Sequence, residues 1–286
     1  MKIIVTGGDG FLGRVLRLSL KSHTVFNYDI TTAHSILDTV QLEQIFSTFQ
    51  PEAVIHLAAT ADLNLYTLSP SRSEEINVVG TQNILAMCEK YGARLLFAST
   101  CCSYGNTRVH PSTEETPPEP TEPYAESKVI SEQHILQKGL PHCCMRLGTF
   151  YGPAMRPALA PAIFLDRAHH NFPIDIHGDG NQTRTMTYID DIVAGIIQIL
   201  ESEPLYTIIN VTSEEITSVN KMIQIALALS GNDVPLNYIQ DRTGQIYKEN
   251  ISSQRLQSLG WTPTTSFADG MRRSYEFYIK NGNKWT

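Results

Sequence analysis

Over its first half the chain alternates short, mostly apolar runs with segments in which apolar residues recur every three or four positions. The first pattern is typical of buried strands and the second of amphipathic helices. The apolar runs predict strands over residues 2–5, 23–28, 53–59, 94–100 and 142–150. The periodic segments predict helices over residues 11–20, 40–49, 73–91 and 124–137. This regular alternation indicates an α/β fold built on a doubly wound parallel sheet.

The pattern loosens after residue 150. A turn signal, Gly178-Asp179-Gly180, lies within residues 174–191 and precedes an apolar helix that ends near Leu200. Beyond it the pattern predicts a strand over 206–212 and helices over 218–230 and 266–280. We therefore expect residues 1–150 to form a Rossmann domain that is completed by about 183–205. Residues 151–286 should form a smaller C-terminal α/β lobe, interleaved with the first.

The first predicted strand leads directly into a glycine cluster. Gly7, Gly10 and Gly13 are spaced three residues apart, and a helix begins at Phe11. Glycine permits a sharp turn and lets backbone approach a ligand closely. The N–H groups at the start of the helix then favour an anion such as a pyrophosphate. A glycine cluster alone is weak evidence, but its place between a strand and a helix predicts dinucleotide binding.

The second predicted strand ends at Asp29, about 20 residues after the glycines. A carboxylate at this point accepts hydrogen bonds from an adenosine ribose, and it repels a 2′-phosphate. The sequence therefore favours NAD over NADP as the cofactor.

Composition excludes several classes of protein. The 286 residues include 22 Lys and Arg against 29 Asp and Glu, a net charge of −7, which argues against a broad nucleic-acid surface. No apolar run approaches the roughly 18 residues of a membrane span. Met1 and Lys2 lead directly into the first strand, so we expect no signal peptide and no membrane partner.

The chain has five cysteines, and an odd number without a signal peptide is typical of reduced thiols in the cytoplasm. We therefore expect a cytoplasmic protein. The spacing of cysteine and histidine matches no zinc site, so we expect no metal.

Two predicted elements carry polar residues that could serve the fold or a ligand. His56 ends the third strand, and we interpret it as a packed histidine rather than a catalyst. The small residues after it leave room for a flat cofactor. Asn77, on the predicted 73–91 helix, faces either solvent or a catalytic centre, and spacing alone does not decide between them.

Hydroxyl groups gather at Ser99 and Thr100, where the fourth predicted strand ends, and the carboxyl ends of parallel strands are where open α/β sheets bind ligands. After a proline-rich loop at 109–123, a helix opens with Tyr124 and Lys128 four residues apart on one face. A Lys ammonium near a phenol favours the phenolate, so Tyr124 could act as a general base.

In this order, the glycine loop, Asp29, Thr100, Tyr124 and Lys128 resemble the extended short-chain dehydrogenase/reductases, specifically the NAD-dependent nucleotide-sugar epimerase/dehydratase family. The resemblance covers nearly the whole chain. Further matching motifs are His56-Leu57-Ala58-Ala59, Tyr104-Gly105, Arg146 to Pro153, Gly178-Asp179-Gly180 with Arg184, and Gly260-Trp261-x-Pro263.

The resemblance implies roles for individual residues. The implied catalytic residues are Thr100, Tyr124 and Lys128. The implied NAD-binding residues are Gly7, Gly10, Phe11, Leu12, Gly13, Asp29, Leu37, Asp38, Leu57, Ala58, Ala59, Asn77, Tyr124, Lys128 and Leu147. The implied substrate-binding residues are Thr100, Thr149, Arg184 and Arg242. The family commonly forms homodimers through its two long helices, here about 73–91 and 122–137.

The chain departs from the family at positions that bear on chemistry. Thr149 replaces an asparagine that the family usually has, and Thr185 replaces an aspartate after Arg184. Cys101 and Cys102 stand where the 4,6-dehydratases carry an Asp-Glu pair after the catalytic threonine. Without that acid and base, elimination of water has no evident catalyst.

The resemblance therefore predicts an NAD-dependent epimerase of a nucleotide-diphosphate sugar, acting through a transient keto-sugar. Tyr124 removes a hydroxyl proton while hydride passes to NAD and later returns. A nucleotide-sugar keto-reductase or decarboxylase on the same fold is the alternative. A non-catalytic NAD-sensing protein is a third, although such proteins commonly lack the tyrosine or the lysine.

Overall fold

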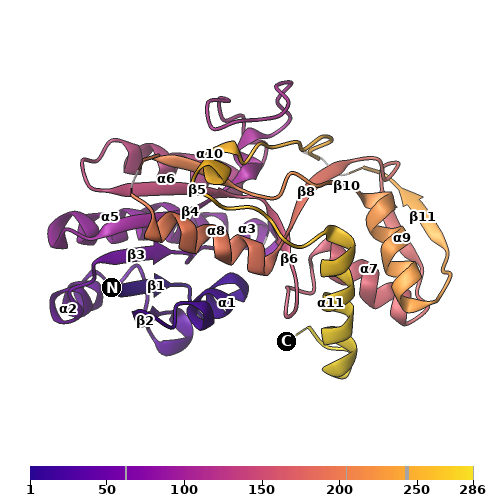
Figure 1. Cartoon of the computed structure of the whole chain (residues 1–286), viewed down its shortest axis with the longest axis horizontal. Coiled ribbons are helices and arrows are strands. Elements are labelled where there is room, and N and C mark those ends of the chain that lie inside the picture. The colour runs from indigo at the N-terminus through magenta and orange to yellow at the C-terminus, as the bar shows by residue number, and fades with distance from the viewer. Residues whose placement is uncertain (62, 204, 242–244, 286) are drawn as a thin grey trace.

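The central element of the computed structural model is a six-stranded sheet in which every pair of neighbouring strands is parallel (Figure 1). Residues 1–61, 63–203, 205–241 and 245–285 are described. The strand order is β2-β1-β3-β4-β5-β9. Their bounds are β1 Lys2–Thr6, β2 Thr24–Tyr28, β3 Ala53–His56, β4 Arg94–Thr100, β5 His142–Leu147 and β9 Ile208–Val211. The doubly wound α/β sheet that the sequence predicts is confirmed.

Helices cover both faces of this sheet. One face packs against α1 and α8, and the other packs against α2, α5 and α6. Their bounds are α1 Phe11–Ser19, α2 Thr39–Phe49, α5 Gly80–Tyr91, α6 Pro123–Leu136 and α8 Ile189–Glu201. Successive strand residues point to opposite faces, so Ile3 and Val5 join one core and Ile4 joins the other. Because both faces of the sheet are buried, the sequences of its strands are continuous apolar runs rather than alternating polar and apolar residues.

The chain order reverses between β1 and β3. From β1 the chain continues to β2 on one side, and it later returns to place β3 on the other side. Ligands of open α/β sheets bind beyond the carboxyl ends of the strands at such a reversal. The fold therefore places a ligand crevice at the ends of β1 and β3.

The predicted 142–150 strand is in fact two strands in two sheets. β5 stays in the central sheet, whereas β6, Thr149–Tyr151, pairs with β8, Thr183–Tyr188, in a three-stranded sheet of order β10-β8-β6. Gly148 joins them, and a Cβ there would lie 2.7 Å from Thr212 Cβ. Close contact with a neighbouring chain segment thus fixes the point at which the chain changes sheets.

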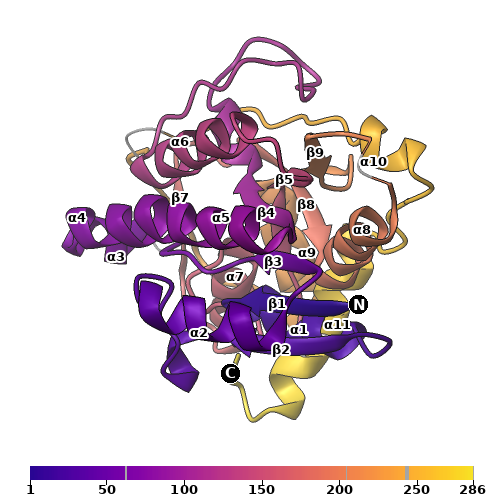
Figure 2. The same ribbon diagram turned by 90° about the vertical axis from the view of Figure 1, so that its left-hand side faces the viewer.

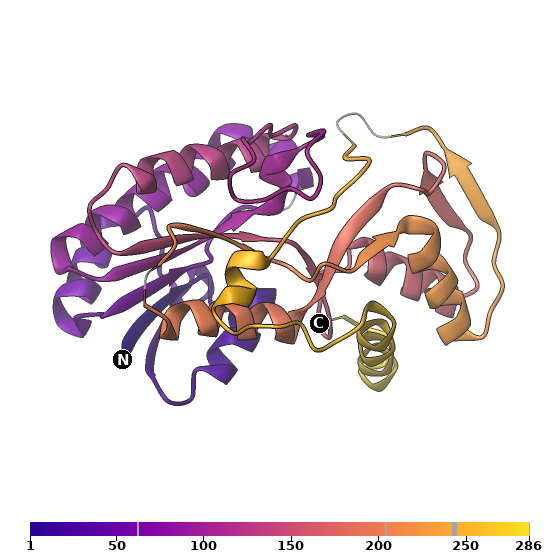
Figure 3. The ribbon, with the colours of Figure 1, turned by 45° about the horizontal axis from the view of Figure 1, so that its top comes forward.

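Figure 3 shows the second lobe beside the first. It contains β6, β8, β10, a β11-β7 pair and three helices. The remaining bounds are α7 Ala160–His169, β7 Ile174–His177, β10 Ile216–Ser218, α9 Val219–Ser230, β11 Leu236–Ile239, α10 Gln254–Ser258 and α11 Phe267–Lys280. The sequence predicts α9 and α11 but not α7, β11 or α10. The segment that returns to the Rossmann domain extends through β9, beyond the predicted limit near 205.

The predicted 73–91 helix has three parts. A short helix, α4 at Pro70–Glu74, follows α3 at Leu63–Leu68 and leads into a turn of π-helix, η2, at Glu75–Val79. The chain then continues as α5, which lies beside α6 (Figure 2). π-Helical turns occur often at functional sites, and this one contains Asn77.

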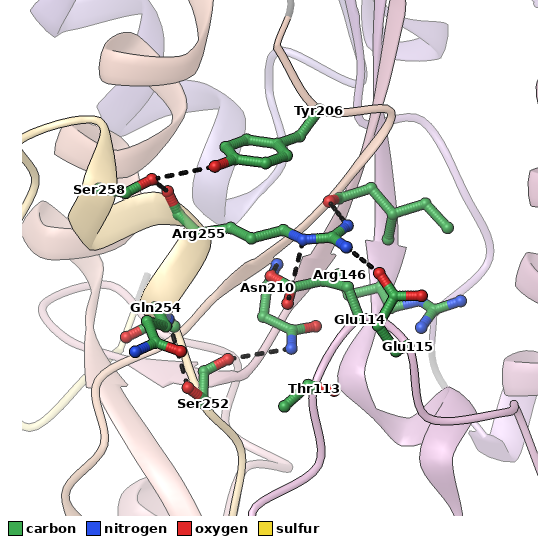
Figure 4. A network of polar contacts seen from close by, with 12 residues as sticks. Thr113, Glu114, Glu115, Arg146, Tyr206, Asn210, Ser252, Gln254, Arg255 and Ser258 are labelled. Carbon is green, nitrogen blue, oxygen red and sulfur yellow. Dashed lines mark hydrogen bonds and ion pairs between the residues drawn. The ribbon is translucent and has the colours of Figure 1, made fainter.

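Strand β9 lies at an edge of the sheet, and two side chains cover its free backbone groups (Figure 4). The Asn210 N–H donates to Glu114 Oε1 at 2.8 Å, and Arg255 Nη1 donates to the Ile208 carbonyl at 3.0 Å. Arg255 and Glu114 lie 3.7 Å apart and pair with each other. Unpaired edges invite association with other strands, so this ion pair protects the edge.

All five cysteines are free. Cys143 and Cys144 are adjacent on β5 but point into the two different cores, and Cys88 and Cys101 are also buried. Cys102 is the one that is partly exposed. None of the helices in the described ranges is long and apolar enough to cross a membrane.

Candidate active site

The glycine loop makes the closest backbone approach in the crevice. Gly7 has a φ of +67°, and a Cβ on it would lie 2.7 Å from the backbone nitrogen of Ala58, just beyond β3. A Cβ on Gly13 would lie 2.5 Å from Gly8 Cα. Side chains at these positions would push the loop away from β3 and from α1. The positive φ of Gly7 agrees with the predicted sharp turn, and the close approach of these glycines to a ligand stays a prediction.

The start of α1 is suited to an anion. Gly10 is its N-cap residue and offers no side chain to satisfy the first N–H groups of the helix. Phe11 and Leu12 follow, Leu12 buried against the core and Phe11 stacked on Phe150 at 5.7 Å between ring centroids. The loop thus leaves backbone donors at the end of a fixed helix, as a pyrophosphate requires.

Asp29 lies beside the glycine loop at the end of β2. Its carboxylate accepts hydrogen bonds from the backbone N–H of Asp9 at 2.9 Å and from the N–H and hydroxyl of Thr31 at 2.9 and 3.0 Å. These contacts fix a carboxylate at the position from which a ribose is read. Its predicted contact with NAD stays a prediction.

Asp38 has a structural task that the sequence did not suggest. It is the N-cap of α2, and its Oδ1 accepts from the backbone N–H groups of Val40 and Gln41 at 3.1 and 3.0 Å. The side chain is exposed and Leu37 is half-buried. The predicted contact of Leu37 and Asp38 with adenine stays a prediction.

The end of β3 forms the opposite wall of the crevice. Leu57, Ala58 and Ala59 are half-buried, and the Ala58 N–H donates to Thr6 Oγ1 at 3.2 Å. Leu147 is buried at the end of β5. The predicted contact of these residues with a flat cofactor stays a prediction.

His56 is a packed histidine, as the sequence analysis concluded. Its ring is fully buried between the hydroxyls of Thr6 and Thr81, at 2.6 and 3.0 Å. Burial lowers its pKa to about 3, and the charge of Lys128 acts in the same direction. His56 is therefore neutral and joins β1 to α5.

Asn77 connects the crevice wall to the catalytic helix. Its amide oxygen accepts from the Thr60 N–H at 2.8 Å, and its amide nitrogen donates to the Thr60 carbonyl and to Ser127 Oγ, both at 3.1 Å. Ser127 in turn donates to the Tyr124 carbonyl at 2.7 Å. The buried Asn77 thus faces the catalytic centre and positions α6, and its predicted contact with NAD stays a prediction.

Thr100 and Tyr124 meet around the turn that follows β4. This turn, η3 at Cys101–Tyr104, begins with the Cys102 N–H donating to Thr100 Oγ1 at 3.1 Å. Burial raises the pKa of the Tyr124 phenol, and the nearby Cys102 thiol raises it further. The turn therefore brings the hydroxyl of Thr100, the thiol of Cys102 and the phenol of Tyr124 to one place.

Lys128 lies behind Tyr124, with its ammonium nitrogen 4.7 Å from the centroid of the Phe97 ring and 5.9 Å from that of Tyr124. Burial lowers the pKa of Lys128 to about 7, and the carboxylate of Glu132 opposes this shift. The sequence predicts that Lys128 lowers the pKa of Tyr124. The effect of Lys128 on the pKa of Tyr124 stays a prediction.

A buried ion pair that the sequence analysis did not identify supports these residues. Glu132 lies one turn after Lys128 on α6, and Arg146 on β5 binds both its oxygens, at 3.0 and 2.7 Å. Ser99 donates to the same carboxylate, and Arg146 also donates to the Tyr104 hydroxyl at 3.0 Å. The four-residue spacing from Lys128 to Glu132 was the available signal.

The second lobe places Arg184 and Glu249 opposite the catalytic turn. Arg184 on β8 donates to the Ile246 carbonyl at 2.7 Å and lies 3.9 Å from the buried Glu249. Glu249 and, more weakly, Arg184 influence the pKa of Cys102, which burial raises to about 11. Arg184 and Glu249 thus lie near Cys102, and Glu249 is a polar residue there without any periodic signal in the sequence.

Thr149 and Arg242 are the two other predicted substrate residues. Thr149 is half-buried at the start of β6, directly after the chain leaves the central sheet. Arg242 lies outside the described residues. The substrate contacts of Thr149, Arg184 and Arg242 stay predictions.

Three comparisons with known proteins bear on the family and fold of this chain. The model of the NAD dependent epimerase/dehydratase family matches residues 3–212. A putative UDP-glucose 4-epimerase of Methanocaldococcus jannaschii is 29% identical over 99% of both chains. A UDP-glucose 4-epimerase of Thermotoga maritima, solved with UDP-glucose, has a TM-score of 0.91 and 28% identity over 98% of this chain and 99% of that one.

A further solved structure was determined with its cofactor. The UDP-glucuronic acid 4-epimerase of Bacillus cereus, in complex with UDP-glucuronic acid and NAD, has a TM-score of 0.89 and 26% identity, and covers 98% of this chain and all of that one. The family resemblance that the motifs indicate is thereby confirmed.

Proposed function

Because this chain belongs to the NAD-dependent epimerase/dehydratase family and is an NAD-dependent enzyme, we propose that it epimerises a nucleotide-diphosphate sugar through a transient keto-sugar. One observation carries the proposal. Thr100 and Tyr124 both lie near Cys102 in the turn after β4, with Lys128 behind Tyr124, while the two positions that supply acid and base in the dehydratases hold Cys101 and Cys102. This set suits reversible hydride transfer and lacks groups for elimination.

Tyr124 is the proposed base for the sugar hydroxyl, and Thr100 is placed to hold the same oxygen in line. NAD supplies the hydride acceptor and a positively charged nicotinamide ring. Positive charge close to Tyr124 offsets the burial that raises its pKa. Lys128, with a pKa near neutrality, is then able to exchange its proton as the charge beside it changes.

Arg184 is the proposed contact for the diphosphate of the substrate. Its guanidinium is held by the Ile246 carbonyl and by Glu249, so its orientation is fixed before a ligand arrives. Arginine suits phosphate because its planar fork donates two parallel hydrogen bonds. The structures of relatives with UDP-glucose and UDP-glucuronic acid support a nucleotide-sugar substrate.

The test is incubation of the NAD-loaded protein with a panel of UDP-, dTDP-, GDP- and CDP-sugars. Products are read by NMR and reduced cofactor by absorbance, with Tyr124→Phe as the matched inactive variant. We expect one sugar to be converted to an epimer with no lasting change in reduced cofactor. In a parallel incubation with added NADH or NADPH, stoichiometric consumption of the reduced cofactor would instead identify a reductase, and release of carbon dioxide would identify a decarboxylase.

We also propose that two copies pair through α5 and α6, as in the resembling enzymes. From the last residue of η2 along α5, an exposed stripe at helical spacing is formed by Val79, Gln82, Ala86 and Glu89. Light scattering should give twice the chain mass of 31.9 kDa, and Ala86→Arg should reduce it to that of one chain. A wild-type mass of 31.9 kDa would contradict the proposal.

A cytoplasmic location stays a prediction.

A further inference from the structure

Asp9, within the glycine loop, is part of a charged network at the ribose edge of the crevice. Its carboxylate accepts from Arg17 Nη2 at 2.7 Å, from Asn27 Nδ2 at 3.0 Å and from the Thr31 hydroxyl. These hydrogen bonds, that of Thr31 first, lower the pKa of the Asp9 carboxyl below its ordinary value. Asp9 is therefore an anion throughout the working pH range.

Asp9 is directly joined to Asp29. The backbone N–H of Asp9 donates to Asp29 Oδ2 at 2.9 Å, and the hydroxyl of Thr31 contacts both carboxylates. Two carboxylates thus share one edge of the crevice, and Asp29 is the one at the ribose position. A phosphate on the 2′-oxygen of that ribose would lie close to both negative charges.

Arg17 is the cation in contact with this edge, and Asp9 restrains it. Its Nε donates to the Gly8 carbonyl at 2.9 Å while its Nη2 binds Asp9. A Cβ on Gly8 would lie 3.0 Å from Arg17 Cδ and would also strike the Asn27 amide oxygen. The glycine therefore makes room for the arginine to lie along the loop rather than toward the crevice.

We propose that Asp9 is a second determinant of cofactor choice, which excludes NADP both by its own charge and by holding Arg17 away from a 2′-phosphate. An arginine at the edge of the ribose site is otherwise well suited to bind phosphate. Asp29 alone would then repel the phosphate while Arg17 attracted it. With Arg17 paired to Asp9, the attraction that Arg17 would offer the phosphate is removed.

The test measures cofactor choice directly. The full chain is equilibrated with an equimolar mixture of NAD and NADP, and both retained cofactors are quantified after rapid desalting. Asp9→Ala should lower the retained ratio of NAD to NADP by about tenfold or more, because it removes one charge and releases another. Asp9→Asn keeps the shape and an acceptor oxygen, and should give a smaller decrease.

The double variant Asp9→Ala/Arg17→Met identifies the released cation. It should lose most of the NADP binding that Asp9→Ala gains, whereas Arg17→Met alone should leave the ratio near that of the wild type. Asp175→Asn, on the exposed face of β7, is the matched control for loss of an aspartate charge. Every variant keeps the backbone N–H that holds Asp29.

A merely structural Asp9 would weaken both cofactors together and leave their ratio unchanged. The proposal is overturned by a ratio within twofold of the wild type in both Asp9→Ala and Asp9→Asn. It is also overturned if the double variant keeps the full gain in NADP, because Arg17 would then have no part in it. Should Asp9→Ala fail to fold, the near-isosteric Asp9→Asn carries the comparison.

Discussion

Burial moves the pKa values of the two central side chains in opposite directions. It raises that of Tyr124 and lowers that of Lys128 to about 7. Both shifts favour the neutral forms, because charge is costly away from water. Loss of the Tyr124 proton therefore depends on a positive charge beside its phenol.

Replacement of the phenol tests that role. Tyr124→Phe should lower turnover by about 10²- to 10⁴-fold, the usual contribution of a general base, because the ring still packs but no longer accepts a proton. Product formation is followed by NMR, with retained NAD and the thermal midpoint measured alongside. Tyr238→Phe, at an exposed position on β11, is the control. Near wild-type turnover in Tyr124→Phe would remove it from the mechanism.

His56 makes stability depend on pH in a predictable direction. Its pKa is about 3 in the folded protein against 6.5 in the unfolded chain, so only the unfolded chain binds a proton between these values. Stability is therefore complete above pH 6.5 and is lost as the pH falls toward 3.

Between pH 7 and pH 5 this one histidine should cost about 2 kcal/mol of unfolding free energy. The variant His56→Gln does not titrate, so its urea midpoint should change less over this interval than that of the wild type. Equal changes in the two proteins would show that His56 is protonated in the folded state.

At the scale of elements, the glycine loop depends on contact between backbone atoms. Gly13→Ala raises helix propensity by about 1 kcal/mol, but the added Cβ meets Gly8 Cα at 2.5 Å. A backbone atom cannot rotate away as a side chain can. We therefore expect the clash to outweigh the gain in helix propensity and to lower the free energy of unfolding by about 1–3 kcal/mol.

We therefore expect Gly13→Ala to lower the thermal midpoint and to weaken NAD binding by about tenfold or more, as measured by titration. Gly139→Ala is the matched control, because a Cβ there meets nothing within 4 Å. It should remain within about 0.5 kcal/mol of the wild type. Comparable NAD affinity in both variants would contradict this account of the loop.

Local pattern predicts most elements of the Rossmann domain because each is buried on a regular face. The strand over residues 94–100 is predicted with its observed bounds. The strand over 142–150 is not, since only the packing of Gly148 against Thr212 shows that the chain changes sheets there. The π-helical turn at Asn77 likewise depends on contacts with Thr60 and Ser127.

The sequence predicts the site residues that belong to motifs. It does not predict those that come together only when the chain folds. Thr100, Tyr124 and Lys128 follow from spacing and resemblance. Glu249 comes from an irregular segment and reaches Arg184 only because that segment lies along β8 in the fold. Glu114 and Arg255, which bind the backbone of the β9 edge strand, are far apart in sequence, and no motif or spacing connects them.

At the scale of the whole molecule, the chain crosses between its two lobes several times. It leaves the central sheet at Gly148, returns for α8 and β9, and ends on α11 beside β8. Neither lobe is therefore a continuous segment, and the predicted boundary near residue 150 marks only the first crossing. Folding of one lobe brings together residues of the other.

The distribution of the five thiols gives the protein a built-in chemical reporter. Four are buried in the cores, and Cys102 alone is partly exposed, beside Thr100 and near Tyr124. A disulfide reagent should modify one thiol in the native protein and five after unfolding. The reaction should be slow near neutral pH, because burial raises the pKa of Cys102 to about 11 and little thiolate is present.

A ligand bound near Cys102 should slow the labelling further, and Cys102→Ser should abolish it. The rate of labelling would therefore measure occupancy of the site before any substrate is known. Labelling of several thiols at one rate in the native state would show that the cores open as readily as the crevice.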